Sequence, residues 1–566
     1  MNEPSFAKAL FYGALPEPSI FPFDPPVASE TLAPALESWR RFFDKQPLED
    51  ESWLRDRESW RAMGRLGVLG MGTQRNLGGT QWSASAQARA FQDLMTIDAS
   101  LGYAVLSHVA LATHALAAFG QRAAVDPVIR NLASGESIGA FALAEPGAGS
   151  DAASLQTHAA LGADSRYVLS GTKGWVTNAQ IADAVALFAR TSPADDGHKP
   201  RITAFLVNRV DGFSTSDTPA KLGVVALPTG FIHLDRVVVD RNARLGEEGR
   251  GFRVAMEVLN RARLSFAAGC VGLSKRVIRA TIDRANTRRA FARAIGDFGL
   301  IKDKIATMLA NVFALESMVF ATTQAVDRGD ADFSVESAIC KVFASETTWQ
   351  VAHEAMNIAA SAGFSVDAPF EKALRDARFG LLFQGTNETL RCFIALSGMQ
   401  GPGREIEEVA RAMREPIKGF GLLGDFAWRK ARSALGRERL THHHPLLNRE
   451  AVLLEEHAQA LARNVEKVLR RHGHQIAEMQ FSQKRIADVA IDLYAIACAL
   501  ARTTSLLNAR GENGARRALD FTSVFVNAAE QRLTQNETNF DRNDDELRKA
   551  VGARAYADGN YPLDVL

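Results

Sequence analysis

The sequence is poor in features that mark several classes of protein. It holds only four cysteines in 566 residues, and their spacing fits neither a metal site nor disulfide pairs. We interpret all four as small buried apolar residues in a reducing compartment. They are Cys270, Cys340, Cys392 and Cys498. The formal net charge is only +1, so the composition gives no support for a nucleic-acid partner.

Long apolar runs are also missing, since none reaches the roughly 20 residues that a membrane span needs. The N-terminal residues 1–7 carry an early acid and no apolar stretch, which argues against a signal or transit peptide. We therefore expect a cytoplasmic protein with at most a peripheral contact with the inner membrane. At 566 residues the chain is too long for a single core.

What the sequence does have is a change of periodicity along its length. Apolar residues recur at helical spacing in residues 1–140, alternate in short β-rich runs in 141–245, and return to helical spacing in 246–400 and 401–566. The pattern predicts a helical N-terminal domain, a small antiparallel β sandwich or barrel, a helical bundle and an additional helical domain. Within the last, residues 411–439 form a basic amphipathic segment.

Two helical stretches are of interest on this basis. Leu101–Ala112 is apolar nearly all round and predicts a buried helix. His108 and His114 have no accompanying ligand partner, so we interpret them as core or surface histidines. A second predicted helix, Leu264–Ile278, follows Arg263.

One short stretch combines a loop with a helix start. An apolar run ends at Gly385, and Thr386–Glu388 then opens a new helical pattern that extends to Leu396. A helix N-terminus presents backbone N–H groups that bind anions or acceptors. Physical chemistry alone leaves this stretch as an ordinary capped helix start.

With the residues before it, the same stretch resembles a known active-site signature. Arg375-Asp-x-Arg378 followed by Phe383-x-Gly385-Thr-Asn-Glu388 is similar to the C-terminal signature of the acyl-CoA dehydrogenases. The resemblance is to the very-long-chain branch and runs along nearly the whole chain. It implies that Gln384 occupies the position of the glutamate that removes the α-proton of the substrate.

A second pair of motifs strengthens the resemblance. The Gly-rich turn Ala144–Asp151 is followed at family spacing by Gly174–Asn178, and in the family these segments hold the isoalloxazine ring of FAD. The implied FAD contacts are Phe141, Leu143, Ala144, Ser150, Trp175, Thr177, Arg288, Thr386 and Glu388. The implied contacts of the acyl-CoA substrate are Ser150, Arg263, Phe383 and Gly385.

The resemblance also assigns particular roles to some of these residues. It places Trp175 on the flavin, the hydroxyl of Thr177 near N5, and Arg288 at the FAD pyrophosphate of a neighbouring subunit. It implies that Leu101–Ala112 lines the acyl-chain tunnel. For residues 411–439 it implies peripheral membrane attachment, although a solvated basic loop is an equal reading because glycines interrupt the segment.

Several residues depart from the family pattern. Gln384 is an amide and essentially non-basic, and the alternative base position before Arg263 holds Ala262. Ala144 lacks a hydroxyl that the family uses on the flavin. Ala360 and Ser361 stand where the family has glycines against the pyrophosphate, which argues against tight FAD binding.

These observations predict a protein that binds long-chain fatty acyl-CoA, with α,β-dehydrogenation lost or impaired. One alternative is a functional FAD-dependent long-chain or very-long-chain acyl-CoA dehydrogenase of fatty acid β-oxidation, with an electron-transfer flavoprotein as partner. Another is an inactive partner subunit in a hetero-oligomer. The resemblance implies a homodimer, and we expect no metal site.

Overall fold

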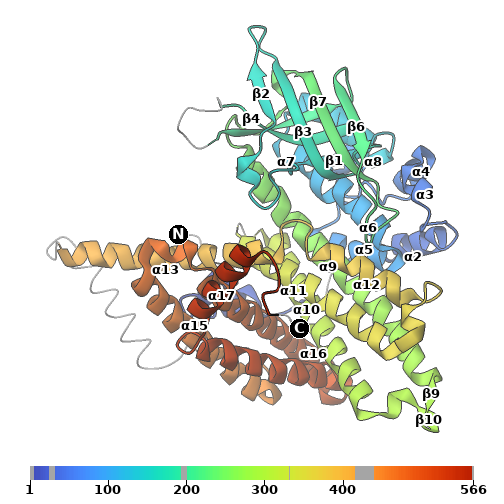
Figure 1. The fold of residues 1–566 in the computed structure, drawn as a ribbon. Coiled ribbons are helices and arrows are strands. Elements are labelled where there is room, and N and C mark those ends of the chain that lie inside the picture. The colour runs from blue at the N-terminus through green and yellow to red at the C-terminus, as the bar shows by residue number, and fades with distance from the viewer. Residues whose placement is uncertain (1–4, 25–31, 193–199, 330–331, 415–438, 564–566) are drawn as a thin grey trace.

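The architecture is a β-domain standing on a large assembly of helices (Figure 1). The computed structural model describes residues 5–24, 32–192, 200–329, 332–414 and 439–563. The predicted fold class is confirmed: helices precede and follow a central sheet, and further helices lie at the C-terminal end. Most of the predicted basic segment, residues 415–438, lies outside the described residues.

The N-terminal part is helical, and side-chain caps fix where several of its helices begin. The Asp98 carboxylate accepts a hydrogen bond from the Leu101 backbone N–H at 3.0 Å and so starts α6. The predicted burial of Leu101–Ala112 is confirmed, because α6 and the π-helical segment Ser107–Thr113 are buried throughout. The helices are α1 Phe6–Leu10, α2 Leu32–Phe43, α3 Glu51–Arg55, α4 Arg57–Arg65, α5 Ala84–Ile97, α6 Ala99–Leu106, α7 His114–Phe119 and α8 Arg122–Ser134.

The middle part is one sheet in the order β6-β7-β3-β2-β4-β5-β8, with β1 beside β4. Most pairs are antiparallel, while β1 and β2 each run parallel to β4. Strand β4 is buried on both faces except at its last residue, as a central strand should be. The strands are β1 Gly139–Ala142, β2 His158–Leu161, β3 Tyr167–Thr177, β4 Ala184–Arg190, β5 Ile202–Asn208, β6 Phe213–Asp217, β7 Thr229–Val239 and β8 Arg244–Leu245.

The remaining helices form the bundle and its C-terminal addition. The predicted helix start after Arg263 is wrong, because α9 begins at Gly251 and Arg263 lies within it. Charged residues interleaved with the apolar ones before Arg263 hid this continuity. The elements are α9 Gly251–Thr287, β9 Arg289–Ala290, β10 Arg293–Ala294, α10 Gly299–Arg328, α11 Ser334–Ala359, α12 Pro369–Gly380, α13 Asn387–Arg414, α15 Asn448–His472, α16 Gln480–Thr538 and α17 Asp545–Asp558.

Two helical stretches are longer and more apolar than expected from the sequence, in which no apolar run reached the length of a membrane span. Ala99–Phe119 and Gly299–Arg328 could each cross a membrane by length and composition alone. Their most apolar windows are 83% and 67% buried inside the fold. That burial is typical of core helices, and both stretches pack against α9, as do α5 and α11.

Candidate functional site

The loop between α12 and α13 carries Gln384, and α12 fixes this loop to the rest of the molecule. Asp376 on α12 is buried and accepts hydrogen bonds from the Val224 backbone N–H at 2.6 Å and from Lys372 at 2.7 Å. Lys372 also binds the Asp98 carboxylate at 2.9 Å, at the start of α6. Helix α12 is therefore bonded both to a loop of the β-domain and to the N-terminal helices.

Two buried cations hold the backbone of the loop itself. The Arg263 guanidinium on α9 donates to the Gln384 carbonyl at 3.4 Å, and burial lowers the pKa of Arg263 to about 10. Lys341 on α11 donates to the Gly385 carbonyl at 2.7 Å and to the Asn387 side chain at 2.8 Å. Burial, together with the charge of Arg263, lowers the pKa of Lys341 to about 7. The neighbouring backbone carbonyls of Gln384 and Gly385 are thus each held by a buried basic side chain.

The side chain of Gln384 stands apart from this network. Its backbone has a φ of 59°, a left-handed conformation that is uncommon for a residue with a side chain. Both its amide nitrogen and its amide oxygen are buried and have no hydrogen-bond partner among the described residues. Buried polar atoms without partners are rare and costly in folded proteins. The amide is therefore available to a ligand that reaches this loop.

Aromatic rings surround the loop on the side of the N-terminal helices. Phe383 stacks on Phe379 with ring centroids 4.9 Å apart, and Tyr103 of α6 meets both rings edge-on. Phe266 of α9 closes the cluster at 6.1 Å from Tyr103. Phe383 therefore lies against the buried helix that the resemblance assigns to the acyl chain.

The two predicted flavin segments lie side by side in the β-domain. The Gly174 backbone N–H donates to the Ala144 carbonyl at 3.1 Å, and Lys173 donates to the Leu143 carbonyl at 3.0 Å. Lys173 also forms a buried ion pair of 2.8 Å with Glu145. Although burial opposes ionisation, the Lys173 charge and several hydrogen bonds hold the pKa of Glu145 below its usual range. This pair fixes the Gly-rich turn against β3.

A β-bulge turns Trp175 outward. The register between β3 and β7 shifts between Lys173 and Val176, and Trp175 between them has a φ of 57°. Its ring is 57% exposed, while Thr177, two residues on, is buried. At Gly147 and Gly149 an added Cβ would meet nothing within 4 Å. A large flat ring therefore stands uncovered beside an open turn.

This arrangement fits the ring end of a flavin. Trp175 supplies a face for stacking, and the open turn leaves room for a planar group to approach the backbone. Phe141 and Leu143 are half-buried nearby, and Ser150 is exposed on the turn. If FAD binds, these residues with Thr177 would hold its ring system.

The pyrophosphate end fits less well. Ala360 has a φ of 54° and a ψ of −132°, a conformation that glycine adopts readily and alanine does not. Ala360 and Ser361 are both exposed, so their side chains project where the resemblance expects bare glycine backbone. Arg288 directly follows α9, about 38 Å along the helix from Arg263. In Figure 1 the next element, β9, lies at the opposite end of the molecule from β3, the strand that carries Trp175.

Two further predicted contacts lie at the start of α13. The Thr386 hydroxyl bonds with that of Thr389 at 3.0 Å, and Glu388 is exposed in the first helical turn. The site assignments as a whole stay predictions. Sequence reasoning missed Lys341, whose only signal is a single lysine within the apolar run of α11.

Comparison with family models matches four successive parts of the chain. Residues 29–136, 140–237 and 249–399 match the N-terminal, middle and C-terminal domains of acyl-CoA dehydrogenase. Residues 445–551 match the ACAD9/ACADV C-terminal domain. The domain boundaries drawn from periodicity stay a prediction, and α13 runs through the boundary placed after residue 400.

Individual proteins resemble the chain over most of its length. The very long-chain specific acyl-CoA dehydrogenase of Homo sapiens mitochondria is 34% identical over 522 residues, covering 89% of this chain and 79% of the relative. An acyl-CoA dehydrogenase from Bacillus anthracis, solved in complex with FAD, superimposes with a TM-score of 0.82 at 24% identity, covering 98% and 96% of the two chains. A structure described as the electron transferring flavoprotein of Acidaminococcus fermentans gives a TM-score of 0.62 at 28% identity, covering 65% and 98%.

Proposed function

We infer that this chain, which belongs to the acyl-CoA dehydrogenase family, binds long-chain fatty acyl-CoA and has lost or weakened α,β-dehydrogenation. The observation that carries the proposal is Gln384, whose buried amide has no partner at the loop that the family resemblance assigns to the catalytic base. Long-chain specificity is supported by the similarity to the human relative, a very long-chain specific acyl-CoA dehydrogenase.

The chemistry explains why Gln384 matters. Dehydrogenation of a thioester removes a proton from Cα while a hydride leaves Cβ, and FAD, when bound, accepts that hydride. A primary amide cannot take the proton, and loss of a general base costs about 10²- to 10⁴-fold in rate. The Gln384 amide can instead donate to the thioester carbonyl and accept from a polar group. Because Arg263 and Lys341 fix the loop, that amide is held in place for binding.

A second candidate function is a working FAD-dependent dehydrogenase of fatty acid β-oxidation. The exposed Trp175 ring and the open turn at Gly147 and Gly149 support it, since both suit a flavin ring. The similarity to the Acidaminococcus structure supports an electron-transfer flavoprotein as partner in that case. A homodimer in the cytoplasm, with peripheral contact at the inner membrane, remains part of the proposal.

The test begins with the visible absorbance of the purified protein before and after incubation with FAD and gel filtration. Reduction of a dye with palmitoyl-CoA is then compared in the unmodified chain, Gln384→Glu, and Gln384→Glu combined with Ala360→Gly and Ser361→Gly. We expect weak flavin retention and no appreciable activity in the first two. Gln384→Asn serves as the non-basic control. Turnover of the unmodified chain in the usual enzymatic range of about 1–10³ s⁻¹ would establish the second candidate instead.

A further inference from the structure

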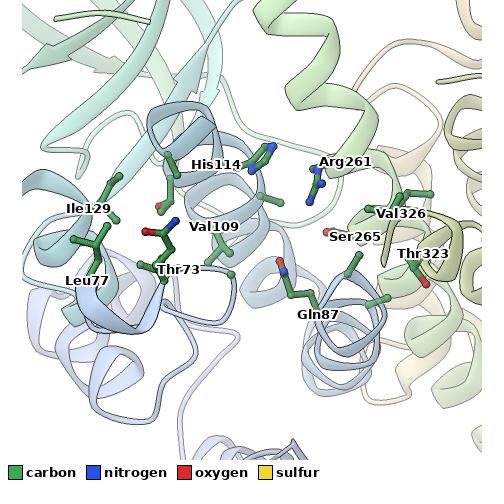
Figure 2. Close-up of a pocket in the computed structure, with 18 of the residues that line it drawn as sticks. Thr73, Leu77, Gln87, Val109, His114, Ile129, Arg261, Ser265, Thr323 and Val326 are labelled. Atoms are coloured by element: carbon green, nitrogen blue, oxygen red, sulfur yellow. The ribbon is translucent and has the colours of Figure 1, made fainter. Parts of the chain in front are cut away.

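A cavity of about 170 Å³ is lined on one side by α9 (Figure 2). Arg261, Leu264 and Ser265 face it, whereas Arg263 lies roughly 160–200° around the helix from Arg261 and Ser265 and faces the Gln384 loop. The other walls come from residues 72–77, α5, the π-helical segment, α7, α8 and α10. The cavity is therefore distinct from the Gln384 site, although one helix separates them.

Polar and apolar side chains line this cavity in nearly equal shares. Aliphatic side chains from six different segments cover part of its walls. They are Leu77, Ala88, Val109, Ala110, Ile129, Leu264 and Val326. Liquid water occupies about 30 Å³ per molecule, so the space corresponds to roughly six atoms of the size of a methylene or a water.

One end of the cavity carries an unusual cation. Arg261 is solvent-exposed at that end and has no hydrogen bond or ion pair among the residues that the structure describes. Figure 2 places its side chain beside His114, which also has no hydrogen-bond partner in the described parts of the chain. Burial, and then the charge of Arg261, lower the pKa of His114 to about 4, so its ring is neutral. Arg122, the other lining arginine, is paired with Asp126 at 3.6 Å.

A buried hydroxyl gives a second, independent sign of a ligand. Thr73 lines the same cavity, is 4% exposed, and its hydroxyl has no partner within the described ranges. The other lining threonines are satisfied, since Thr113 donates to the His108 carbonyl at 2.8 Å and Thr323 to the Phe320 carbonyl at 3.2 Å. A buried hydroxyl without a protein partner is ordinarily met by water or a ligand.

We propose that this cavity binds the carboxylate end of an aliphatic chain. The carboxylate pairs with Arg261 beside His114, and the methylene groups of the chain pack along the aliphatic side chains. An unpaired guanidinium at the end of such a cavity suits a carboxylate, which accepts two parallel hydrogen bonds from it. The volume admits about six atoms, hence a short fatty acid or the last carbons of a longer chain.

Two sources supply the same chemistry. A free fatty carboxylate could enter from the Arg261 end. Alternatively, the carboxylate could be the far end of a dicarboxylic acyl-CoA whose thioester lies at Gln384, because the width of a helix, about 10–12 Å, separates the two places. The second source rests on the proposed function, while the first does not.

The first experiment measures binding of hexanoate to the full-length protein by calorimetry, with hexan-1-ol as the uncharged comparison. Arg261→Gln is expected to weaken hexanoate binding at least about ten-fold and leave hexan-1-ol unchanged, since a charge-assisted hydrogen bond is lost. Arg261→Lys should restore part of it. Arg253→Gln is the matched control, because Arg253 lies on the same helix, is exposed and pairs with Glu257 at 2.7 Å.

The second experiment separates the sources by titrating palmitoyl-CoA and hexadecanedioyl-CoA into the same variants. If the dicarboxylic compound binds more tightly and only its advantage depends on Arg261, the carboxylate is the far end of the substrate. If hexanoate binds undiminished alongside saturating palmitoyl-CoA, the cavity takes a free carboxylate. Absence of any Arg261-dependent preference for a carboxylate in both experiments overturns the proposal. Hexanoate binding without acyl-CoA binding would refute the proposed function and leave this inference standing.

Discussion

Among the residues that the structure describes, two lysines are completely buried, and their hydrogen-bond partners differ in charge. Lys173 in the β-domain forms an ion pair with Glu145, whereas Lys341 under the Gln384 loop meets only the neutral oxygens of Gly385 and Asn387. Burial lowers the pKa of both, to about 8 for Lys173 and about 7 for Lys341. Glu145 partly offsets the effect at Lys173, while Arg263 adds to it at Lys341.

The difference shows what the loop lacks. A carboxylate at position 384 would place a negative charge next to two buried cations, Arg263 and Lys341. The amide of Gln384 offers none, so the negative charge that acts on Lys341 comes from other residues, among them Glu346 and Glu388. The Lys173 pair holds a turn together, and the Lys341 region is arranged for an acceptor or anion that the chain does not itself provide.

Of the substitutions that test this comparison, one at Lys173 is expected to have the largest effect on stability. Lys173→Met leaves the buried Glu145 carboxylate without its partner, and we expect a loss of about 3–5 kcal/mol in the free energy of unfolding. Lys341→Met is the matched variant, because it also removes a buried lysine but strands no opposite charge. Urea denaturation monitored by circular dichroism gives both values. Equal losses in the two variants would contradict the distinction.

The second prediction concerns pH and Lys341. The pKa of Lys341 is about 7 in the folded protein, whereas an unperturbed lysine, as in the unfolded chain, has a pKa of 10.5. Between these pH values the unfolded chain binds more protons than the folded one, so the free energy of unfolding rises with pH. Lys341→Met should remove about 2 kcal/mol of the rise between about pH 7 and about pH 9. Denaturation curves at several pH values measure this. An unchanged pH slope would show that Lys341 titrates normally.

The third prediction tests the unpaired amide. Gln384→Met keeps the shape and removes two buried polar atoms without partners, so we expect a gain of about 1 kcal/mol in stability. The same variant should bind palmitoyl-CoA more weakly, because the ligand loses a hydrogen-bonding group. Thermal unfolding measures the change in stability, and calorimetry measures the change in affinity for palmitoyl-CoA. The proposal fails at this position if affinity is unaffected.

The smallest effect is expected at Ala360. Glycine relieves the left-handed strain there but adds entropy to the unfolded chain, so Ala360→Gly should gain less than about 1 kcal/mol. Its clearer readout is retention of FAD after gel filtration, which should increase. Ala359→Gly, one residue earlier in helical backbone with a φ of −73°, is the control and should lose stability.

The sequence by itself determined the order of helical and β regions, the buried Leu101–Ala112 helix and the departure at Gln384. Each of these is readable locally, as periodicity, as an unbroken apolar run or as one residue within a motif. The α9 start was misplaced because charged residues interrupt its apolar pattern.

The tertiary structure alone decided what surrounds those residues. Lys341 meets Gly385 across 44 positions and Arg263 meets Gln384 across 121, while Arg261 faces its cavity from a position only two residues before Arg263. Such pairings depend on how helices pack, and two positions along a helix turn a side chain by about 200°. That rotation points Arg261 and Arg263 in different directions, and the local sequence pattern does not predict what each side chain faces.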